Sequence, residues 1–266
     1  MSMSGVLVLG GVWLLWTAAV AAARLMDSDD SDPARGLFRL VMLGYSRIVQ
    51  RLAVSGEVPA PRPTGRGLLI VANHTSVVDP IVVQAALPYE VRWVMGADMA
   101  TPLFERFWRY ARVILVDRTG EGDSRAQVRE AINHLKRGGV LGVFPEGFIE
   151  RPPRTLLPFQ DGVGLFVTRS GALVVPVVIE GTPQTDPIEG AFARRGRVKV
   201  RFLPAIDYRE KKLGAAEIAA DLRRVFKEAT GWPTSEHAPK WQRGRWVDLN
   251  LDGTYKGEER TAKSEQ

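Results

Sequence analysis

Two short stretches carry side chains that could do acid–base chemistry. Residues 73–79 (N-H-T-S-V-V-D) place an imidazole and a carboxylate five residues apart, and residues 144–147 (F-P-E-G) add a second carboxylate. A carboxylate beside an imidazole fixes its tautomer and stabilises the cation that forms when the ring accepts a proton. The spacing therefore indicates a histidine base, His74, oriented by Asp79.

His74 and Asp79 can meet only if the chain turns between them. In one regular helix, a separation of five residues puts two side chains roughly 140° apart. The apolar run 67–72 is typical of a buried strand, and Pro80 suits the first position of a helix. We therefore expect Asp79 to be the N-cap of that helix and His74 to lie on the loop before it. The alternative is a simple cap beside an incidental loop histidine.

Strand-like and helical segments alternate along most of the chain. Expected strands are 67–72, 91–94, 112–116, 140–144, 173–179 and 198–203, and expected helices include 123–137 and 215–229. This alternation predicts an α/β fold with a largely parallel central sheet covered by helices on both sides. Sites in such folds lie at the carboxyl ends of the strands, where both stretches above would fall.

Residues 1–26 are expected to form a membrane-inserted helix. Residues 5–23 carry no charged side chain, and a helix of that length measures roughly 28 Å, close to the hydrocarbon thickness of a bilayer. Arg24 and Arg35 follow the run, which favours a catalytic domain on the cytoplasmic side of the inner (cytoplasmic) membrane. A signal peptide, despite the absence of Lys or Arg before the run, and a buried core helix are the alternatives.

Residues 27–63 are expected to form an amphipathic interfacial helix, over 35–52, and a proline-rich connector. Its arginines share one half of the circumference beside a wide apolar arc, which fits a helix in the headgroup region. The alternative is a helix packed on the domain with a solvated arginine stripe. The catalytic domain is expected over 64–230, and a polar, partly disordered tail over 231–266, its last dozen residues disordered.

Composition narrows the possible partners and cofactors. The net charge of +6 favours an anionic partner such as a membrane surface, a phosphorylated substrate or nucleic acid. Nucleic acid does not account for the apolar N-terminus, so none is expected. The chain has no cysteine, which excludes disulfides, thiolate nucleophiles and Cys-ligated zinc. With three histidines in all, of which His134 and His237 have no indicated role, no metal site and no cofactor are expected.

Four segments in order resemble the blocks of the 1-acylglycerol-3-phosphate (lysophosphatidate) acyltransferase family, within the glycerolipid acyltransferase group. They are residues 73–79, 116–118 (V-D-R), 144–147 and 175–182 (V-P-V-V-I-E-G-T). The similarity covers roughly residues 35–230. It implies a glycerolipid acyltransferase-like fold and a role in phospholipid biosynthesis at a membrane. The expected reaction moves a fatty acyl group from acyl-CoA or acyl-carrier protein to a lysophospholipid hydroxyl. The oligomeric state stays open.

The resemblance also implies a set of site residues. His74 would deprotonate the acceptor hydroxyl for direct attack on the thioester, with Asp79 as its catalytic partner. Substrate binding is expected at Arg118, Glu146, Gly147, Asn73, Ser76 and Pro176. Arg118 would bind the acceptor phosphate and Glu146 the acceptor hydroxyls. Alternatively, Arg118 is a surface arginine, Glu146 is a turn residue, and Ser76 makes only a hydrogen bond within the loop.

The chain departs from the family at two places. After F-P-E-G the family commonly has Thr-Arg-Ser, whereas residues 148–150 are F-I-E, with Arg151 and Arg154 downstream. Where many members have Phe-Lys before the next glycine, residues 159–162 are F-Q-D-G. Two cations that would contact an acceptor phosphate are thus missing or displaced.

Several alternatives therefore stay open. The acceptor is 1-acylglycerol-3-phosphate or another lysolipid such as an amino-acid lipid. A non-catalytic lipid-binding protein of the same fold is possible, as is a serine hydrolase that uses Ser76. The aromatic segment 102–110 lines an acyl groove or belongs to the core.

Overall fold

The structure, a computed structural model, describes residues 3–25, 33–58, 66–100, 111–119, 122–242 and 245–255. Three predicted features lie outside these residues: the aromatic segment 102–110, the proline-rich connector over 59–63, and nearly all of the disordered C-terminal dozen.

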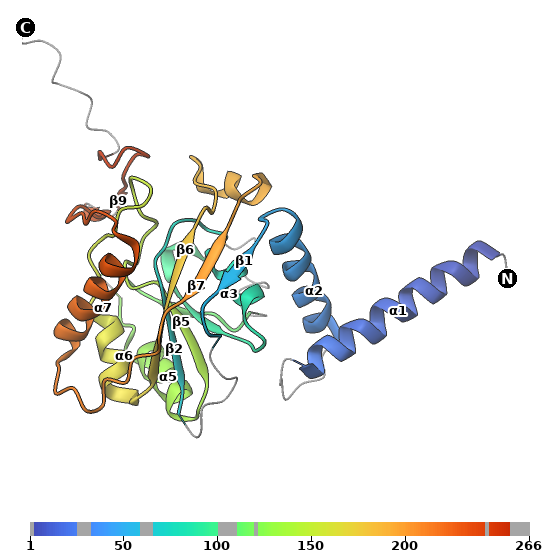
Figure 1. The fold of residues 1–266 in the computed structure, drawn as a ribbon, viewed down its shortest axis with the longest axis horizontal. Helices are drawn as coiled ribbons and strands as arrows, with labels where there is room; N and C mark the ends of the chain where they lie inside the picture. The colour runs from blue at the N-terminus through green and yellow to red at the C-terminus, as the bar shows by residue number, and fades with distance from the viewer. Residues whose placement is uncertain are drawn as a thin grey trace, which may run out of the picture.

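A seven-stranded sheet forms the centre of the molecule (Figure 1). Its strand order is β1-β7-β6-β2-β5-β3-β4, and every neighbouring pair is parallel except β6 and β7. The strands are β1 (Ala53–Ser55), β2 (Leu68–Ala72), β3 (Arg92–Gly96), β4 (Ile114–Val116), β5 (Val140–Val143), β6 (Leu173–Glu180) and β7 (Lys199–Phe202). The prediction of a largely parallel α/β sheet is confirmed.

β2 lies in the middle of the sheet, between β5 and β6. All five of its residues are buried, as in a parallel strand that is covered on both faces and therefore shows no polar alternation. β5 is equally buried, and its Gly142 makes room for β3, because a Cβ there would lie 2.6 Å from the ring of Trp93. The chain leaves β2 at Asn73, so the N-H-x-S-x-x-D segment begins at the carboxyl end of the central strand.

Helices cover both faces of the sheet (Figure 1). One face carries α5 (Arg125–Lys136), α6 (Gly162–Ser170) and α7 (Ala215–Thr230), which bury Leu69 and Val71 of β2. The opposite face carries α3 (Asp79–Ala86), which packs with Leu68 and Ile70. Consecutive residues of β2 thus enter opposite apolar layers, and the prediction of helices on both sides is confirmed.

α1 (Met3–Leu25) packs against α2 (Pro33–Ile48) and extends away from the body of the protein (Figure 1). The two helices approach closely at Gly36, where a Cβ would lie only 1.7 Å from the carbonyl oxygen of Ala19. The apolar side chains of Val12, Trp13, Leu14, Leu15 and Trp16 are all exposed. A helix forms where one was expected, but the predicted transmembrane span was not found. In the described part of the chain, no helix has both the length and the apolar character needed to cross a bilayer.

α2 packs on the folded domain. This was one of the two predicted alternatives, the other being a helix that lies only in the headgroup region. Arg39 donates hydrogen bonds to the carbonyl oxygens of Leu87 and Pro88, at 3.1 and 3.3 Å. Burial lowers the pKa of Arg39, so this arginine is not part of a solvated stripe. The helix ends at Ile48, earlier than the predicted residue 52, because β1 begins at Ala53 and needs a turn before it.

Residues beyond α7 also pack on the domain. Trp232 and Leu249 are buried, and the segment near residue 234 forms a bridge with Leu156. β8 (Lys240–Gln242) and β9 (Arg245–Val247) pair as a small antiparallel hairpin. Residues 233–235 therefore lie against the loop that follows the F-P-E-G turn.

Candidate active site

His74 and Asp79 are in direct contact. Nδ1 of His74 lies 3.0 Å from Oδ2 of Asp79. The Asp79 side chain has no exposed surface, whereas 18% of the His74 side chain is exposed. The ring is thus held from behind by a buried carboxylate and keeps an open edge.

Asp79 is anchored by the loop that precedes it. Its Oδ2 accepts hydrogen bonds from the amides of Thr75 (2.6 Å) and Ser76 (2.8 Å), and its Oδ1 accepts one from Thr75 Oγ1 (3.1 Å). α3 begins at Asp79 itself, and the N-cap residue is Val78, which makes no side-chain cap. The predicted N-cap role of Asp79 is therefore wrong. Its carboxylate bonds backward to the loop amides and shapes the turn that carries His74.

The contact with Asp79 sets the tautomer of His74. An ionised carboxylate only accepts hydrogen bonds, so Nδ1 carries the proton and the lone pair is on Nε2. Within the described residues, Nε2 has no hydrogen-bond partner. The imidazole stacks on Phe144 at 4.1 Å, and Phe144 stacks on Trp93 at 4.9 Å. The three rings fix the plane of the imidazole, leaving Nε2 as the atom available to accept a proton.

The F-P-E-G segment forms a tight turn after β5. The amide of Gly147 donates to the carbonyl of Phe144 at 3.0 Å, and Gly147 has a φ of 72°, which favours glycine. Glu146 is fully buried, and its two carboxyl oxygens lie 3.4 Å from the amides of His74 and Leu157. Burial, with the nearby Glu150 carboxyl, raises the pKa of Glu146 well above its usual value. The turn thus brings Glu146 to the backbone of the histidine loop.

Glu150 is a further site residue, and sequence reasoning missed it. Its amide donates to the carbonyl oxygen of His74 at 2.7 Å, and its side chain is 1% exposed. Oε1 accepts a hydrogen bond from the amide of Arg154, whereas Oε2 is buried without a partner among the described residues. Burial raises the pKa of Glu150 to about 8. The signal in the sequence is the F-I-E departure after F-P-E-G, which places a carboxylate in this loop as well as removing a cation.

Arg118 lies beside the F-P-E-G turn, at the carboxyl end of β4. Its guanidinium donates to both carboxylate oxygens of Asp98, at 2.8 and 2.7 Å. It also donates to the carbonyl oxygen of Gly147 and lies 4.3 Å from the ring centre of Phe148. Arg118 therefore links β4 to the turn and already has a carboxylate as its bidentate partner.

The two arginines downstream of the turn have different surroundings. Arg151 is buried and donates to Oε1 of Gln184 at 2.8 Å and to the carbonyl of Thr185 at 3.2 Å. Burial lowers its pKa. Arg154 is exposed and has a φ of 61°. Of the two displaced cations, Arg151 supports the loop from inside and Arg154 faces solvent.

Three residues with expected substrate contacts are buried within or beside the sheet. The carboxamide of Asn73 bonds to both the amide and the carbonyl of Ile179, at 2.8 and 3.0 Å, and so extends the pairing of β2 with β6. Pro176 pairs with Val71 inside the sheet. Ser76 is 2% exposed, and its Oγ has no hydrogen-bond partner in the described chain. It is therefore not paired with the imidazole as a serine nucleophile would be.

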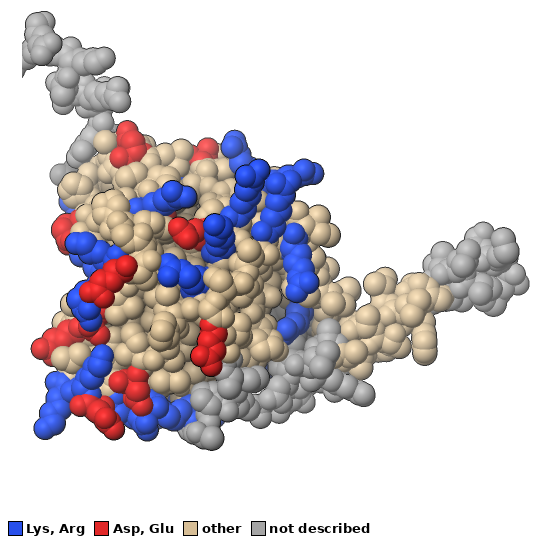
Figure 2. All heavy atoms as spheres, in the orientation of Figure 1, with Lys and Arg blue, Asp and Glu red and all other residues tan. Residues whose placement is uncertain are grey.

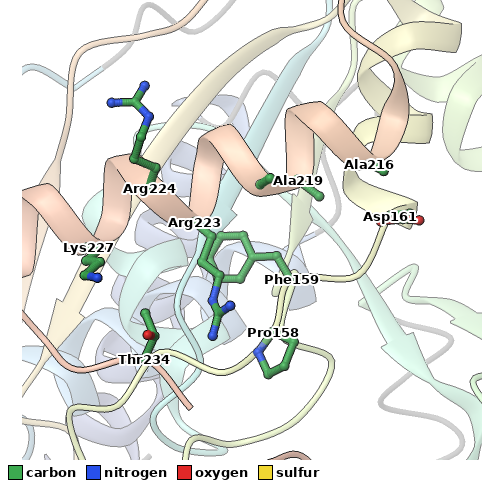
Figure 3. A pocket seen from close by; sticks show the side chains of 10 residues that line it. Pro158, Phe159, Asp161, Ala216, Ala219, Arg223, Arg224, Lys227 and Thr234 are labelled. Carbon is green, nitrogen blue, oxygen red and sulfur yellow. The ribbon is translucent and has the colours of Figure 1, made fainter. Parts of the chain in front are cut away.

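A surface pocket of about 450 Å³ lies elsewhere, along the outer side of α7 (Figure 3). It is lined by Pro158, Phe159, Asp161, Ala216, Ala219, Ala220, Arg223, Arg224, Lys227 and Thr234. Arg223 pairs with Glu236, and Arg224 pairs with Asp221. None of the residues around His74 lines this pocket. Among the described residues, no cluster of His, Cys, Asp and Glu could hold a metal ion.

Comparison with known proteins identifies the domain. Residues 51–180 match the family model described as Acyltransferase. This range contains the His74–Asp79 pair, the F-P-E-G turn and Arg118, so the resemblance inferred from the motifs is confirmed. This part of the chain is thus similar to an acyltransferase domain.

Several relatives with known names match this domain. The N-acylphosphatidylethanolamine synthase of Arabidopsis thaliana is 29% identical over 47% of this chain and 48% of its own length. The 1-acyl-sn-glycerol-3-phosphate acyltransferase of Escherichia coli is 26% identical over 66% of this chain and 72% of its own length. The lyso-ornithine lipid O-acyltransferase of Brucella abortus is 29% identical over 62% of this chain and 58% of its own length. The match spans about half the length of the Arabidopsis relative.

A solved structure shares the fold. The 1-acyl-sn-glycerophosphate acyltransferase of Thermotoga maritima superposes with a TM-score of 0.57 at 20% sequence identity. The superposition covers 82% of this chain and 94% of that protein.

Proposed function

We propose that this protein transfers a fatty acyl group from a thioester to the hydroxyl of a lysolipid, with His74 as the general base. The observation that carries the proposal is the 3.0 Å contact between Nδ1 of His74 and the buried carboxylate of Asp79. It leaves Nε2 with a lone pair, and the part-exposed ring lets an acceptor hydroxyl approach. The acyltransferase match over residues 51–180 supports the reaction class.

In the proposed step, Nε2 of His74 takes the proton of the acceptor hydroxyl while the hydroxyl oxygen attacks the carbonyl carbon of the thioester. Asp79 stabilises the imidazolium that forms. The carbon–sulfur bond then breaks, and the proton passes from Nε2 to the departing thiolate. General-base assistance of this kind contributes roughly 10²–10⁴-fold to the rate. No acyl-enzyme is needed, because the chain has no cysteine and Ser76 is not bonded to the imidazole.

The donor is proposed to be acyl-CoA or acyl-carrier protein, used as a substrate, with no further cofactor. The names of the relatives support more than one acceptor class, because they refer to different lipids. 1-Acylglycerol-3-phosphate and lyso-ornithine lipid are acceptor candidates suggested by the names of two relatives. The product in either case is a diacylated membrane lipid.

The site itself can be tested by following thiol release from purified protein with an acyl thioester and a lysolipid mixture. Wild-type protein is expected to release thiol only when acceptor is present. His74→Ala should lose at least about a hundredfold in rate, with an unchanged circular dichroism spectrum. Full activity in that variant would remove His74 from the mechanism.

We further propose that α1 and α2 attach the protein to the surface of a membrane. Apart from Thr17, the described side chains of α1 are apolar, which is unusual for a helix that contacts water. On α2, the exposed Leu37, Val41 and Ile48 fall within about 40° of one another on the helix wheel. Such a stripe fits a helix lying in the headgroup region.

Cationic side chains gather on the same side of the body, over α2 and the β1–β7 edge of the sheet (Figure 2). The exposed members are Arg47, Arg51, Arg194, Arg195, Arg197 and Lys199. Anionic lipids of a cytoplasmic leaflet attract such a surface by about 1 kcal/mol for each basic side chain close to it. The proposed location is therefore the cytoplasmic face of the inner membrane.

A further inference from the structure

The cations beside the catalytic pair are already in use. Arg118 has a bidentate partner in Asp98 and also holds the Gly147 carbonyl, and Arg151 is buried with Gln184 and Thr185 as acceptors. Positions 148 and 149 are apolar. A phosphomonoester offers only acceptor oxygens and needs several N–H donors. Around the turn, each of these guanidinium groups already donates to at least two protein acceptors.

Buried carboxyl groups outnumber these cations. Asp79, Glu146 and Glu150 are each at most 1% exposed and close enough to interact electrostatically. Asp79 is satisfied by the loop amides and the imidazole. Glu150 is not satisfied, because Oε2 is buried without a hydrogen-bond partner in the described part of the chain. An unsatisfied buried acceptor of this kind is costly and calls for a donor.

We propose that this site selects lysolipid acceptors whose headgroup carries an ammonium group, and that Glu150 is the residue that recognises it. The proposal rests on the proposed function and names its acceptor class. An ammonium group brings several N–H donors and a positive charge for Oε2 of Glu150, the one carboxyl oxygen of this residue that no described donor satisfies. A phosphomonoester brings a second negative group to the same region, with no donor. Glu150 lies next to the catalytic loop, because its amide is bonded to the carbonyl of His74.

The ionisation of Glu150 gives the proposal a pH signature. Burial raises the pKa of Glu150 to about 8, and Asp79 raises it further, whereas the Arg154 amide, Arg151 and the Arg154 side chain lower it. The Glu146 carboxyl faces the same space and interacts with Glu150. As the pH rises from 7 to 8.5, Glu150 becomes ionised. The KM for an ammonium acceptor should then fall several-fold, and the KM for a phosphomonoester acceptor should rise.

The test compares acceptors that share the same glycerol hydroxyl and acyl chain. They are 1-acylglycerol-3-phosphoethanolamine, the matching phosphocholine, which has no N–H, and 1-acylglycerol-3-phosphate. Lyso-ornithine lipid serves as an ammonium acceptor without phosphate. Wild-type protein is expected to show its lowest KM for the two acceptors that carry an N–H ammonium group. Their KM should fall most steeply as the pH rises, that of the phosphocholine acceptor less, and that of 1-acylglycerol-3-phosphate should rise.

Glu150→Gln keeps the shape of the side chain and removes its charge. It should raise the KM for the acceptors with an N–H ammonium group roughly tenfold or more and flatten their pH profile. The KM for the phosphocholine acceptor should rise less, because its quaternary ammonium keeps the charge but offers no N–H donor. Glu210→Gln, at an exposed position, is the matched control and should change neither the KM values nor their pH profiles. A KM rise shared equally by all acceptors would mean a structural role and overturn the assignment.

The wild-type ranking of acceptors tests the proposal even if the variant does not fold. A lowest KM for 1-acylglycerol-3-phosphate overturns the acceptor class, and so does a phosphate KM that rises in Arg154→Ala. Both outcomes leave acyl transfer itself intact. Absence of thiol release with every acceptor and both donors would instead reject the proposed function.

Discussion

The carbonyl oxygen of His74 accepts a 2.7 Å hydrogen bond from the amide of Glu150. This bond joins the loop after β2 to the loop after β5, and the carboxyl of Glu146 approaches the amide of His74 from the same side. The histidine backbone is therefore held by the F-P-E-G loop, while its ring is held by Asp79 and Phe144. Substitutions in either loop are therefore expected to alter the position of the His74 imidazole.

Asp79→Asn should reduce acyl transfer by roughly 10²–10⁴-fold. An amide cannot stabilise the imidazolium, and it can donate to Nδ1 and so favour the wrong tautomer. Thiol release at saturating acceptor measures the effect. The double variant with His74→Ala should be no slower than His74→Ala alone, because the two residues act as a unit. Fully additive losses would contradict the pairing.

The free energy of unfolding should fall as the pH rises from about 5 to 8.5. The pKa of Glu150 is raised to about 8 in the folded protein, so the folded state binds a proton that the unfolded state releases near its ordinary value. The stability this confers is present at low pH and is lost as the pH rises through the folded pKa. One such group gives a slope of up to about 1.4 kcal/mol per pH unit.

Urea unfolding at several pH values measures that slope. Glu150→Gln should make it shallower, and the control Glu210→Gln should not. The fully buried Glu146 contributes in the same direction, so part of the slope is expected to persist in Glu150→Gln. An unchanged slope in Glu150→Gln would show that this carboxyl is ionised in the folded state throughout.

Replacing Trp13 and Trp16 together by Ser should weaken binding to anionic vesicles at least about tenfold, because two large apolar side chains would no longer enter the lipid. Vesicle flotation measures the bound fraction. Leu251→Ser, at another exposed apolar position, is the control and should bind as wild type does. Equal losses in both proteins would argue against attachment through α1.

Asp98→Asn should lower the KM for 1-acylglycerol-3-phosphate several-fold. The change removes the carboxylate that holds Arg118 at 2.7 and 2.8 Å, and so frees N–H donors beside the turn. The KM for an ammonium acceptor should not improve. Steady-state kinetics with both acceptors provides the comparison, and a better KM for both would point to loosening of the loop instead of a released cation.

Local patterns were sufficient to predict six of the seven strands of the sheet, all but β1, and the contact between His74 and Asp79. The apolar run of β2 and the proline of α3 are signals carried by neighbouring residues, and they place His74 at a strand end with Asp79 within reach. The manner of contact was not predictable. Whether a carboxylate at a helix start bonds forward to the helix or backward to a loop depends on loop conformation, which has no periodic signal.

The roles of Asn73, Pro176 and Glu150 show the same limit. A motif match cannot separate a residue that binds substrate from one that closes the sheet, and Asn73 and Pro176 do the second. Glu150 has a buried carboxyl because segments distant in sequence cover it, and its burial sets its pKa. Burial of that kind becomes visible only when the loop is folded against His74.

β1 joins the far edge of the sheet immediately after α2, and its three residues pair with β7. With Arg39 bonded to the chain after α3, the second helix is tied to the domain near its middle and at its C-terminal end. Any lipid layer that holds this helix must therefore meet the domain at one tilt and one depth. The height of the imidazole above the lipid is then set by strand pairing, so an acceptor headgroup would need to rise by a fixed amount to be acylated.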